Sequence, residues 1–554
     1  MSDTQRTLFA GFLIALLTLT IPFYLQFIGV GAEGDDSAVD LDYQADAYIK
    51  NLEESPVSDF SSSNNLLEDG TPIAKNVNKK EIFIETEKFT ITLSNYHGGA
   101  INSVRLNAVL PDNGINYQYV GGYNLNGIYN LNENTLLFSQ PGNTCSPCLM
   151  LENMELGNSF WSIDELALYG GGTKKNLDVL EYEPLLNLTN VDSAVVNMSV
   201  SIDGIHNVRL YKSTTFYRDS FIIKHRYKLN NITENIQVAW LGGLMPTEQN
   251  LTEELTYSQA FVAQNKEISD ISLSPSNIED SAERLSLRGD TDWVAMRNKY
   301  FINALMSERA DGGFIDGKAE YLDPNNQEAL IPLYDMGLSF DNTGSLQVNQ
   351  FIGPLDVDII KQSNTYLDRV MNFGWLPIQP FSRSVLWILK TLNLSGLNYG
   401  IILILFAFLI RLLTGPLTKK SFQSSQKMQS VQPKLKKIQD KYKKDPQRLN
   451  QEMVKLYKTE GVNPLGGCLP MLIQMPLLFS LFIVFRSTIE FRGASFFWWI
   501  TDLSKPDVLF NLPFYIPIYG SHVGLLPVVL GVSMFLSQKL SMANMDSKQK
   551  PMMY

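Results

Sequence analysis

Long apolar runs alternate with polar segments along this chain of 554 residues. Four of the runs are long enough to cross a bilayer as helices: residues 7–32, about 399–417, 465–485 and roughly 523–538. The first run exceeds the ~7–15 apolar residues of a cleavable signal peptide, and bulky Phe23, Tyr24 and Phe27 lie near its end. We therefore expect an uncleaved transmembrane anchor at residues 1–32.

A different pattern fills the region between the first two apolar runs. Residues 33–78 are rich in Asp, Ser, Asn and Glu and poor in large apolar residues, which is typical of a flexible, solvated linker. Residues 79–366 contain short runs of alternating apolar and polar positions, such as 89–93 and 221–225, separated by Gly, Asn and Asp. This pattern predicts a large all-β sandwich domain.

The predicted β domain shows no pattern of catalytic or metal-binding residues. Its histidines, His97, His206 and His225, include no pair at a metal-ligand spacing, and its acidic residues are scattered. Cys145 and Cys148 form one isolated pair, which favours a local disulfide or two idle thiols over a dithiol redox site. A sugar-processing enzyme is an alternative, but a binding or scaffolding module is the better interpretation.

The segment 367–396 combines aromatic and basic residues with an amphipathic pattern. Its apolar residues recur at helical spacing: Val385, Leu386, Leu389 and Leu392. We interpret the segment as an amphipathic helix that lies on the outer membrane face and leads into the second span, 397–417. An ordinary helix packed against the β domain is the alternative.

Residues 418–462 have the clearest helical pattern and a strong positive charge. Met428, Val431, Leu435, Ile438 and Tyr442 follow alternating spacings of three and four, which favours a seam for one partner helix. Because Asp445-Pro446 interrupts this pattern, we expect an antiparallel helical hairpin, with Pro433 either kinking the first arm or marking its start. Its candidate contact residues are lysines: Lys434, Lys436, Lys437, Lys441, Lys443 and Lys444.

The distribution of charge sets the expected orientation. The formal net charge is −12, but acidic residues outnumber basic ones roughly two to one in residues 33–396, and the reverse holds in residues 397–554. Lys-rich loops stay in the cytoplasm, so the hairpin and the tail 541–554 are predicted to be cytoplasmic. The N-terminus is then cytoplasmic too, while the β domain and the loop 487–522 between the third span, 463–486, and the fourth, 523–540, lie outside.

Arg411 places a charge within the second span, where burying it in the bilayer is unfavourable. The properly apolar part from Tyr399 to Ile410 gives roughly 18 Å of helix, too short for a ~30 Å hydrocarbon core, so the span must continue to about Leu417. A charge inside a bilayer is a functional candidate by default. The alternative without a specific function is that the Arg411 side chain snorkels to the inner headgroups.

No other apolar span offers an acidic partner for Arg411. Water, lipid phosphate or a neutral polar group such as Gln474, on the third span, must then solvate it. Prolines and glycines make that third span irregular: Pro464, Gly466, Gly467, Pro470 and Pro476. Irregular backbone is tolerated at membrane depth beside a water-lined cavity. Both features agree with a hydrophilic groove open to the cytoplasm.

Several of these motifs together resemble one known family, the YidC membrane protein insertases in their Gram-negative form. The motifs are Ile410-Arg411, Gly415-Pro416-Leu417-Thr418, Gln432-Pro433-Lys434, Asn463-Pro464-Leu465-Gly466-Gly467-Cys468-Leu469-Pro470 and Leu472-Ile473-Gln474-Met475-Pro476. The resemblance implies a membrane α-helical bundle, a large all-β periplasmic domain (a β-supersandwich) and a cytoplasmic helical hairpin. It also implies a multi-pass protein of the cell inner membrane.

The resemblance further implies a function. The family inserts and folds membrane proteins, alone or with the Sec translocon, without nucleotide hydrolysis or cofactors, and so is not enzymatic. Arg411 and Gln474 would line the client groove, and the hairpin lysines would contact clients and the ribosome. The expected partners are nascent membrane proteins, Sec subunits, the ribosome and anionic lipids, but not DNA. The alternative is a membrane-anchored periplasmic protein that binds or modifies carbohydrate.

The resemblance implies two more spans beyond the fourth. Residues 541–554 would be a cytoplasmic segment that precedes them, so we expect this chain alone not to support insertion.

Overall fold

The computed structural model describes residues within 79–542. Gaps fall at 97, 111–113, 125, 140–145, 152–153, 156–158, 181–183, 203–207, 230–234, 274–281, 324–325, 342–343, 364, 395, 444, 463–468 and 517–519. The predicted anchor, the linker and the segment 543–554 lie outside the described residues. So does Cys145, whereas Cys148 is disulfide-bonded.

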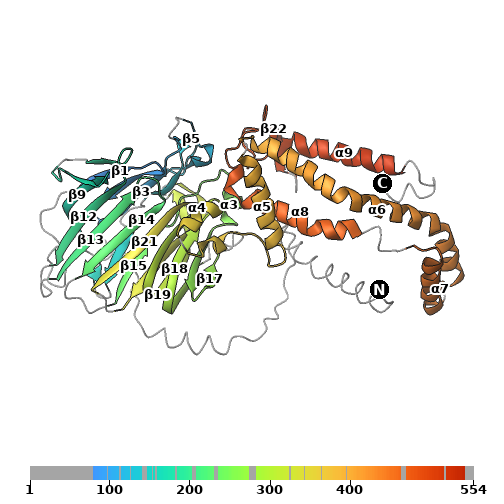
Figure 1. Cartoon of the computed structure of the whole chain (residues 1–554), viewed down its shortest axis with the longest axis horizontal. Coiled ribbons are helices and arrows are strands. Elements are labelled where there is room, and N and C mark those ends of the chain that lie inside the picture. The colour runs from blue at the N-terminus through green and yellow to red at the C-terminus, as the bar shows by residue number, and fades with distance from the viewer. Residues whose placement is uncertain are drawn as a thin grey trace. The chain divides into compact units, whose positions relative to one another are not determined.

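A large antiparallel sheet dominates the β domain (Figure 1). Its main path is β10 (Thr173–Leu177), β9 (Ser162–Gly170), β12 (Ser193–Ile202), β13 (Val208–Tyr217), β14 (Ile222–Leu229), β21 (Ser345–Pro354), β19 (Phe301–Asp323), β20 (Asn326–Phe340), β15 (Ile236–Trp240), β7 (Cys148–Leu151) and β8 (Met154–Glu155). Three more strands extend it beside β19: β18 (Ala282–Arg297), β16 (Gln259–Gln264) and β17 (Glu267–Ile271).

A smaller sheet packs against the larger one. Its order is β11 (Leu185–Asn187), β1 (Glu81–Glu85), β2 (Phe89–Ser94), β3 (Ile101–Leu106) and β6 (Leu136–Ser139). Alternate residues of its strands, such as Ile82 and Ile84, are fully buried and share one core with Phe216 of the larger sheet and with Trp161, which directly precedes β9. The two-residue period therefore separates buried from solvated side chains, and the predicted large all-β domain is confirmed.

Short elements join the two sheets or follow them. They are η1 (Tyr117–Tyr119), β4 (Val120–Tyr123), β5 (Tyr129–Asn134), α3 (Leu251–Leu255), α4 (Val357–Ile360), η3 (Lys361–Ser363) and η4 (Leu367–Val370). Longer helices make up the rest of the described chain. They are α5 (Gln379–Asn393), α6 (Tyr399–Lys441), α7 (Pro446–Thr459), α8 (Leu469–Ser487) and α9 (Leu525–Met542), with η5 (Ile489–Phe491) directly after α8.

Helix α6 is longer than any predicted element because it merges two of them. It runs without interruption through the predicted second span and the first arm of the hairpin, with Pro416 and Pro433 inside it. Pro433 therefore does not mark the start of a helix, and that alternative is wrong. Among the described residues, one helical window is long and apolar enough to cross a membrane, Tyr399–Pro416.

Helix α5 buries the apolar face that its sequence predicts. Val385, Leu386 and Leu389 are almost fully buried in a cluster shared with Ile402 of α6 and Val484 of α8. This face therefore packs against α6 and α8, which contain the second and third predicted spans. The placement of α5 on the outer membrane face stays a prediction. Large apolar residues on the other side of α5 stay exposed, including Trp387 at 68%.

The predicted loop 487–522 contains structure that the sequence pattern did not indicate. It holds η5 and most of a hairpin of β22 (Val508–Ile516) and β23 (Gly520–Gly524) that leads into α9. The alternating pattern in this aromatic-rich loop is too short to distinguish a β-hairpin from irregular structure by sequence alone.

Gly353 offers a test of core packing in the β domain. A Cβ at this position of β21 would lie 2.6 Å from Cδ1 and 3.2 Å from Cβ of Phe221. The contact reaches the base of the Phe221 side chain, so the ring cannot swing away. We expect Gly353→Ala to lower the free energy of unfolding by about 1–3 kcal/mol, measured by thermal denaturation in detergent. Gly344→Ala should be near neutral, because its nearest neighbour would lie 3.7 Å away.

Candidate functional site

Arg411 lies within the apolar window of α6 and its side chain is exposed. Its neighbours Leu412 and Leu413 are exposed by 59% and 68%, so this stretch of helix presents apolar surface around a cation. Only 17% of the window is buried inside the protein. No hydrogen bond or ion pair joins Arg411 to another residue in the described part of the chain. The charge is therefore available to water, lipid or a bound segment.

Gln474 lies on α8, a helix that packs beside α6. Its side chain is half-buried, and no hydrogen bond between Gln474 and Arg411 is present among the described residues. Pro470 and Pro476 lie inside α8. Asn463, Pro464, Gly466 and Gly467 lie outside the described residues, so the entrance to this helix stays a prediction.

The candidate lysines cluster where α6 ends and α7 begins. Lys434 donates to Glu460 at 2.6 Å and so ties the end of α6 to the end of α7. Lys436, Lys437, Lys441 and Lys443 are exposed, and Lys444 lies outside the described residues. Asp445 caps α7 by accepting from the backbone N–H of Arg448. The two helices form a hairpin with a basic, solvated surface.

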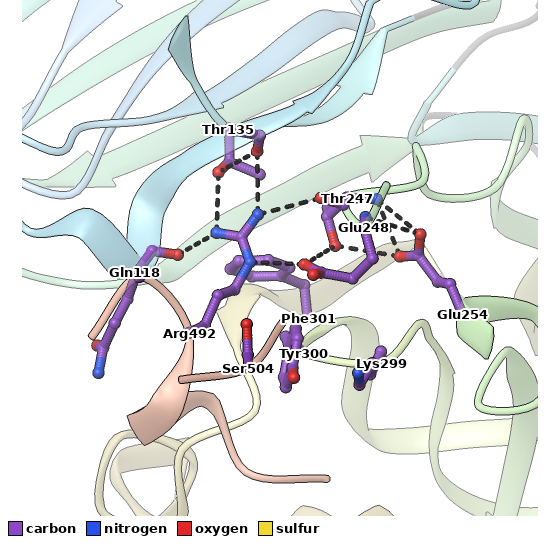
Figure 2. Close-up of polar contacts among 12 residues, drawn as sticks. Gln118, Thr135, Thr247, Glu248, Glu254, Lys299, Tyr300, Phe301, Arg492 and Ser504 are labelled. Atoms are coloured by element: carbon purple, nitrogen blue, oxygen red, sulfur yellow. Dashed lines mark hydrogen bonds and ion pairs between the residues drawn. The ribbon is translucent and has the colours of Figure 1, made fainter. Parts of the chain in front are cut away.

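A second arginine, Arg492, occupies a site that the sequence did not predict (Figure 2). It follows η5 directly, and its side chain is 3% exposed. Its guanidinium enters the β domain and lies 5.3 Å from the centroid of the Phe301 ring. All five of its N–H groups have acceptors: Glu248 Oε1 at 2.6 Å, Gly121 O at 3.0 Å, Thr247 O at 3.1 Å, Thr135 Oγ1 at 3.3 Å and the carbonyl of Gln118.

A second buried carboxyl group supports this site. Glu254 of α3 accepts hydrogen bonds from the backbone N–H groups of Thr247 and Glu248, each at 2.9 Å. Burial, together with the nearby Glu248 charge, raises the pKa of Glu254 to about 7. Burial alone would lower the pKa of Arg492, but the adjoining Glu248 carboxylate outweighs it and the pKa rises. Glu254 thus fixes the backbone that positions the partner of Arg492.

A lysine makes a separate connection nearby. Lys390 of α5 donates to Asp356 and Asp358 at 2.8 Å each and lies 3.2 Å from Glu490 of η5. Asp356 also caps α4, so the lysine links α4, α5 and η5. Burial would lower the pKa of Lys390, but the charge of Glu490 and then that of Asp356 raise it. The segment after α8 is therefore held by one buried ion pair, Arg492–Glu248, and one partly buried pair, Lys390–Glu490.

An open cleft of about 1400 Å³ lies on the larger sheet, lined by residues of β9, β12, β13, β14 and β21. A β-bulge in β9 places Asp164 and Glu165 side by side, where they accept hydrogen bonds from Ser199 and Asn197. The described residues include no group of three His, Cys, Asp or Glu that could hold a metal ion. The arrangement gives a polar, hydrogen-bonded surface.

Two family models match most of the chain. The model described as "60Kd inner membrane protein" matches residues 390–554, and the model described as "YidC periplasmic domain" matches residues 182–388. The boundary between them falls within α5. The matches separate the β domain from the segment that holds Arg411 and the basic hairpin.

Curated relatives agree with these matches. A relative from Chlorobaculum parvum, named "Membrane protein insertase YidC", is 35% identical over 416 residues, which cover 73% of this chain and 68% of the relative. One of the same name from Chlorobium luteolum is 39% identical over 62% of this chain and 59% of the relative. The chain belongs to the YidC membrane protein insertase family.

The chain spans about two thirds of the length of the curated relatives that it matches. The alignments span less than two thirds of some relatives, 59% for Chlorobium luteolum and 64% for Chlorobium phaeovibrioides. Among solved structures, an α-galactosidase from Geobacillus stearothermophilus matches 50% of this chain and 41% of that chain, with 9% identity and a TM-score of 0.25. A likeness this weak has no bearing on function.

Arg492 can be tested by removing its charge. Arg492→Met leaves the Glu248 carboxylate buried without its oppositely charged partner, so we expect the free energy of unfolding to fall by about 3–5 kcal/mol. Thermal denaturation followed by tryptophan fluorescence measures the loss. Arg448→Met, at an exposed ion pair, is the control and should change little. Adding Glu248→Leu to Arg492→Met should recover part of the loss. A double variant no more stable than Arg492→Met would contradict the unpaired charge as its cause.

The raised pKa of Glu254 makes the stability of the folded protein depend on pH, and the sign of this dependence can be tested. Its pKa is about 7 in the folded protein and near 4.5 in the unfolded chain. Between these two pKa values the folded state keeps a proton that the unfolded state has lost. The stability that comes from protonated Glu254 is therefore fully present below about pH 4.5 and is lost as the pH rises to about 7. The Tm difference between wild type and Glu254→Gln should fall over this range and then level off. A constant difference would contradict the raised pKa.

Proposed function

We propose that this protein is a membrane protein insertase and chaperone of the inner membrane that works without nucleotide hydrolysis, alone or with the Sec translocon. The observation that carries the proposal is Arg411, an exposed cation without a protein partner among the described residues, on the one described helix able to cross a membrane. Membership of the family agrees with this function and does not favour the carbohydrate-binding alternative.

The physical role of Arg411 follows from its surroundings. A guanidinium keeps its charge when desolvated, so within a bilayer it needs water or lipid phosphate around it. Half-buried Gln474 on neighbouring α8 supplies a polar group on the same side of the membrane core. A hydrated groove between these helices would attract acidic or polar segments of a client. The cost of moving such a segment part-way across the bilayer is then lower.

The basic hairpin suits the first contact with a client. Its exposed lysines form a positive surface that fits anionic lipid headgroups, ribosomal RNA and acidic nascent chains. In the proposed topology this hairpin is cytoplasmic, the N-terminus is cytoplasmic and the β domain is periplasmic. A client captured at the hairpin would then meet Arg411 further along the same helix, α6.

Arg411 variants test the proposal in a full-length family protein that carries these spans. Arg411→Ala should reduce insertion of a small client with an acidic tail by at least about tenfold, because one desolvated charge interaction is worth more than 1.4 kcal/mol. Arg411→Lys should keep part of the activity. Protease protection of the translocated tail in insertase-depleted membranes is the measurement.

Two controls separate a specific role from general damage. Arg288→Ala removes an exposed charge from the β domain, outside the proposed client path, and should leave insertion near wild type. A client with a neutral tail should depend less on Arg411 than the acidic one. If Arg411→Ala inserts the acidic client normally, the cation merely reaches the headgroups and the groove proposal is wrong.

A further inference from the structure

An exposed aromatic turn follows the buried Arg492 along the chain. It comprises residues 497–500 and is closed by a hydrogen bond from the N–H of Ile500 to the carbonyl of Phe497 at 3.1 Å. Trp498 at its tip is 88% exposed, and Phe497 is 51% exposed. Trp498 also has a left-handed backbone conformation (φ 57°), which is uncommon for a bulky side chain. The fold thus directs a large indole outward at a conformational cost.

Two contacts fix the position of this turn along α6. The side chain of Asn398, the N-cap of α6, donates to the carbonyl of Ser495. The ring of Phe496 lies directly on the helix backbone, because a Cβ at Gly400 would be only 2.0 Å from it. Asn398 directly precedes the apolar window Tyr399–Pro416, and Gly400 is its second residue. The aromatic turn therefore lies level with one end of the predicted membrane span.

The base of the turn is fixed as well. The N–H of Gly493 donates to Asp502 at 3.0 Å, and the N–H of Leu503 donates to the carbonyl of Ala494 at 2.9 Å. These bonds join the two sides of the loop directly after Arg492, which is buried in the β domain. The loop thus has one end in the β domain and its aromatic tip beside the end of α6.

The span that begins beside this loop also carries exposed apolar residues. Ile401, Ile404 and Phe408 of α6 are exposed by 42%, 58% and 63%. This is the surface that the bilayer must cover if α6 crosses it. Tryptophan prefers the headgroup level of a membrane, where its ring is shielded and its N–H meets water.

From this geometry we propose that the aromatic turn is a phospholipid-binding anchor, with Trp498 seated at headgroup depth in the leaflet nearest the β domain. The inference rests on the proposed placement of α6 in the membrane. It also gives the loop a role: Arg492 holds one end and Trp498 the other, so the loop sets the height of the β domain above the bilayer.

Fluorescence quenching by brominated phospholipids tests the anchor in the reconstituted full chain. Of the seven tryptophans, Trp161, Trp240 and Trp293 are fully buried in the β domain and insensitive to lipid. The emission of wild type minus that of Trp498→Phe isolates Trp498. We expect lipids brominated near the headgroup to remove most of this difference emission, and iodide in the buffer to remove little.

A second variant separates the anchor from the membrane span. Phe408→Trp in the Trp498→Phe background reports on α6 and should be quenched by lipids brominated near the chain ends. If that tryptophan is quenched but Trp498 responds to iodide alone, the anchor is wrong and the span stands. If Trp498 responds to neither quencher, a protein surface covers it, and the lipid proposal is equally wrong. If neither tryptophan responds to lipid, the placement of α6 itself fails.

Discussion

A guanidinium group cannot release its proton at any pH that a protein meets, so an arginine removed from water must be given acceptors. Arg492 meets this constraint completely: every N–H has an oxygen, one of them the Glu248 carboxylate at 2.6 Å. The backbone of η1, β4 and the 247–248 segment must be in place to supply those oxygens. Arg492 therefore joins three separate stretches of the β domain to the segment after α8.

Arg411 presents the opposite solution to the same constraint. The described part of the protein gives it no oxygen, so its solvation must come from the surroundings of α6. The first arginine makes a fixed contact, and the second leaves a charge unsatisfied by protein. This contrast explains why the buried arginine serves stability while the exposed one is the candidate for recognition of a changing series of clients.

Local patterns predicted those features that depend on local rules. The two-residue period of segments such as 89–93 separates inside from outside in a sheet, and length and hydropathy identify the window Tyr399–Pro416. Arg492 was missed because its partner Glu248 is 244 positions away, and only the folded chain brings them together. The signal was present in Ile489-Glu490-Phe491-Arg492, where two charges alternate with apolar residues directly after an apolar helix. The outward side of α5 was likewise ambiguous, since periodicity shows which residues share a face but not what covers it.

The continuity of α6 has a mechanical consequence. Its 43 residues form a rod of roughly 65 Å, with Arg411 in the first third and the basic turn at the far end. The helix is unbroken between Arg411 and Lys441, so a displacement at its basic end is transmitted toward Arg411 to the extent that the helix stays straight. Pro416 and Pro433 each remove a backbone N–H donor, which makes them the points where such a rod would bend. If the hairpin captures clients as proposed, the stiffness of α6 at these two prolines determines how much of that motion reaches Arg411.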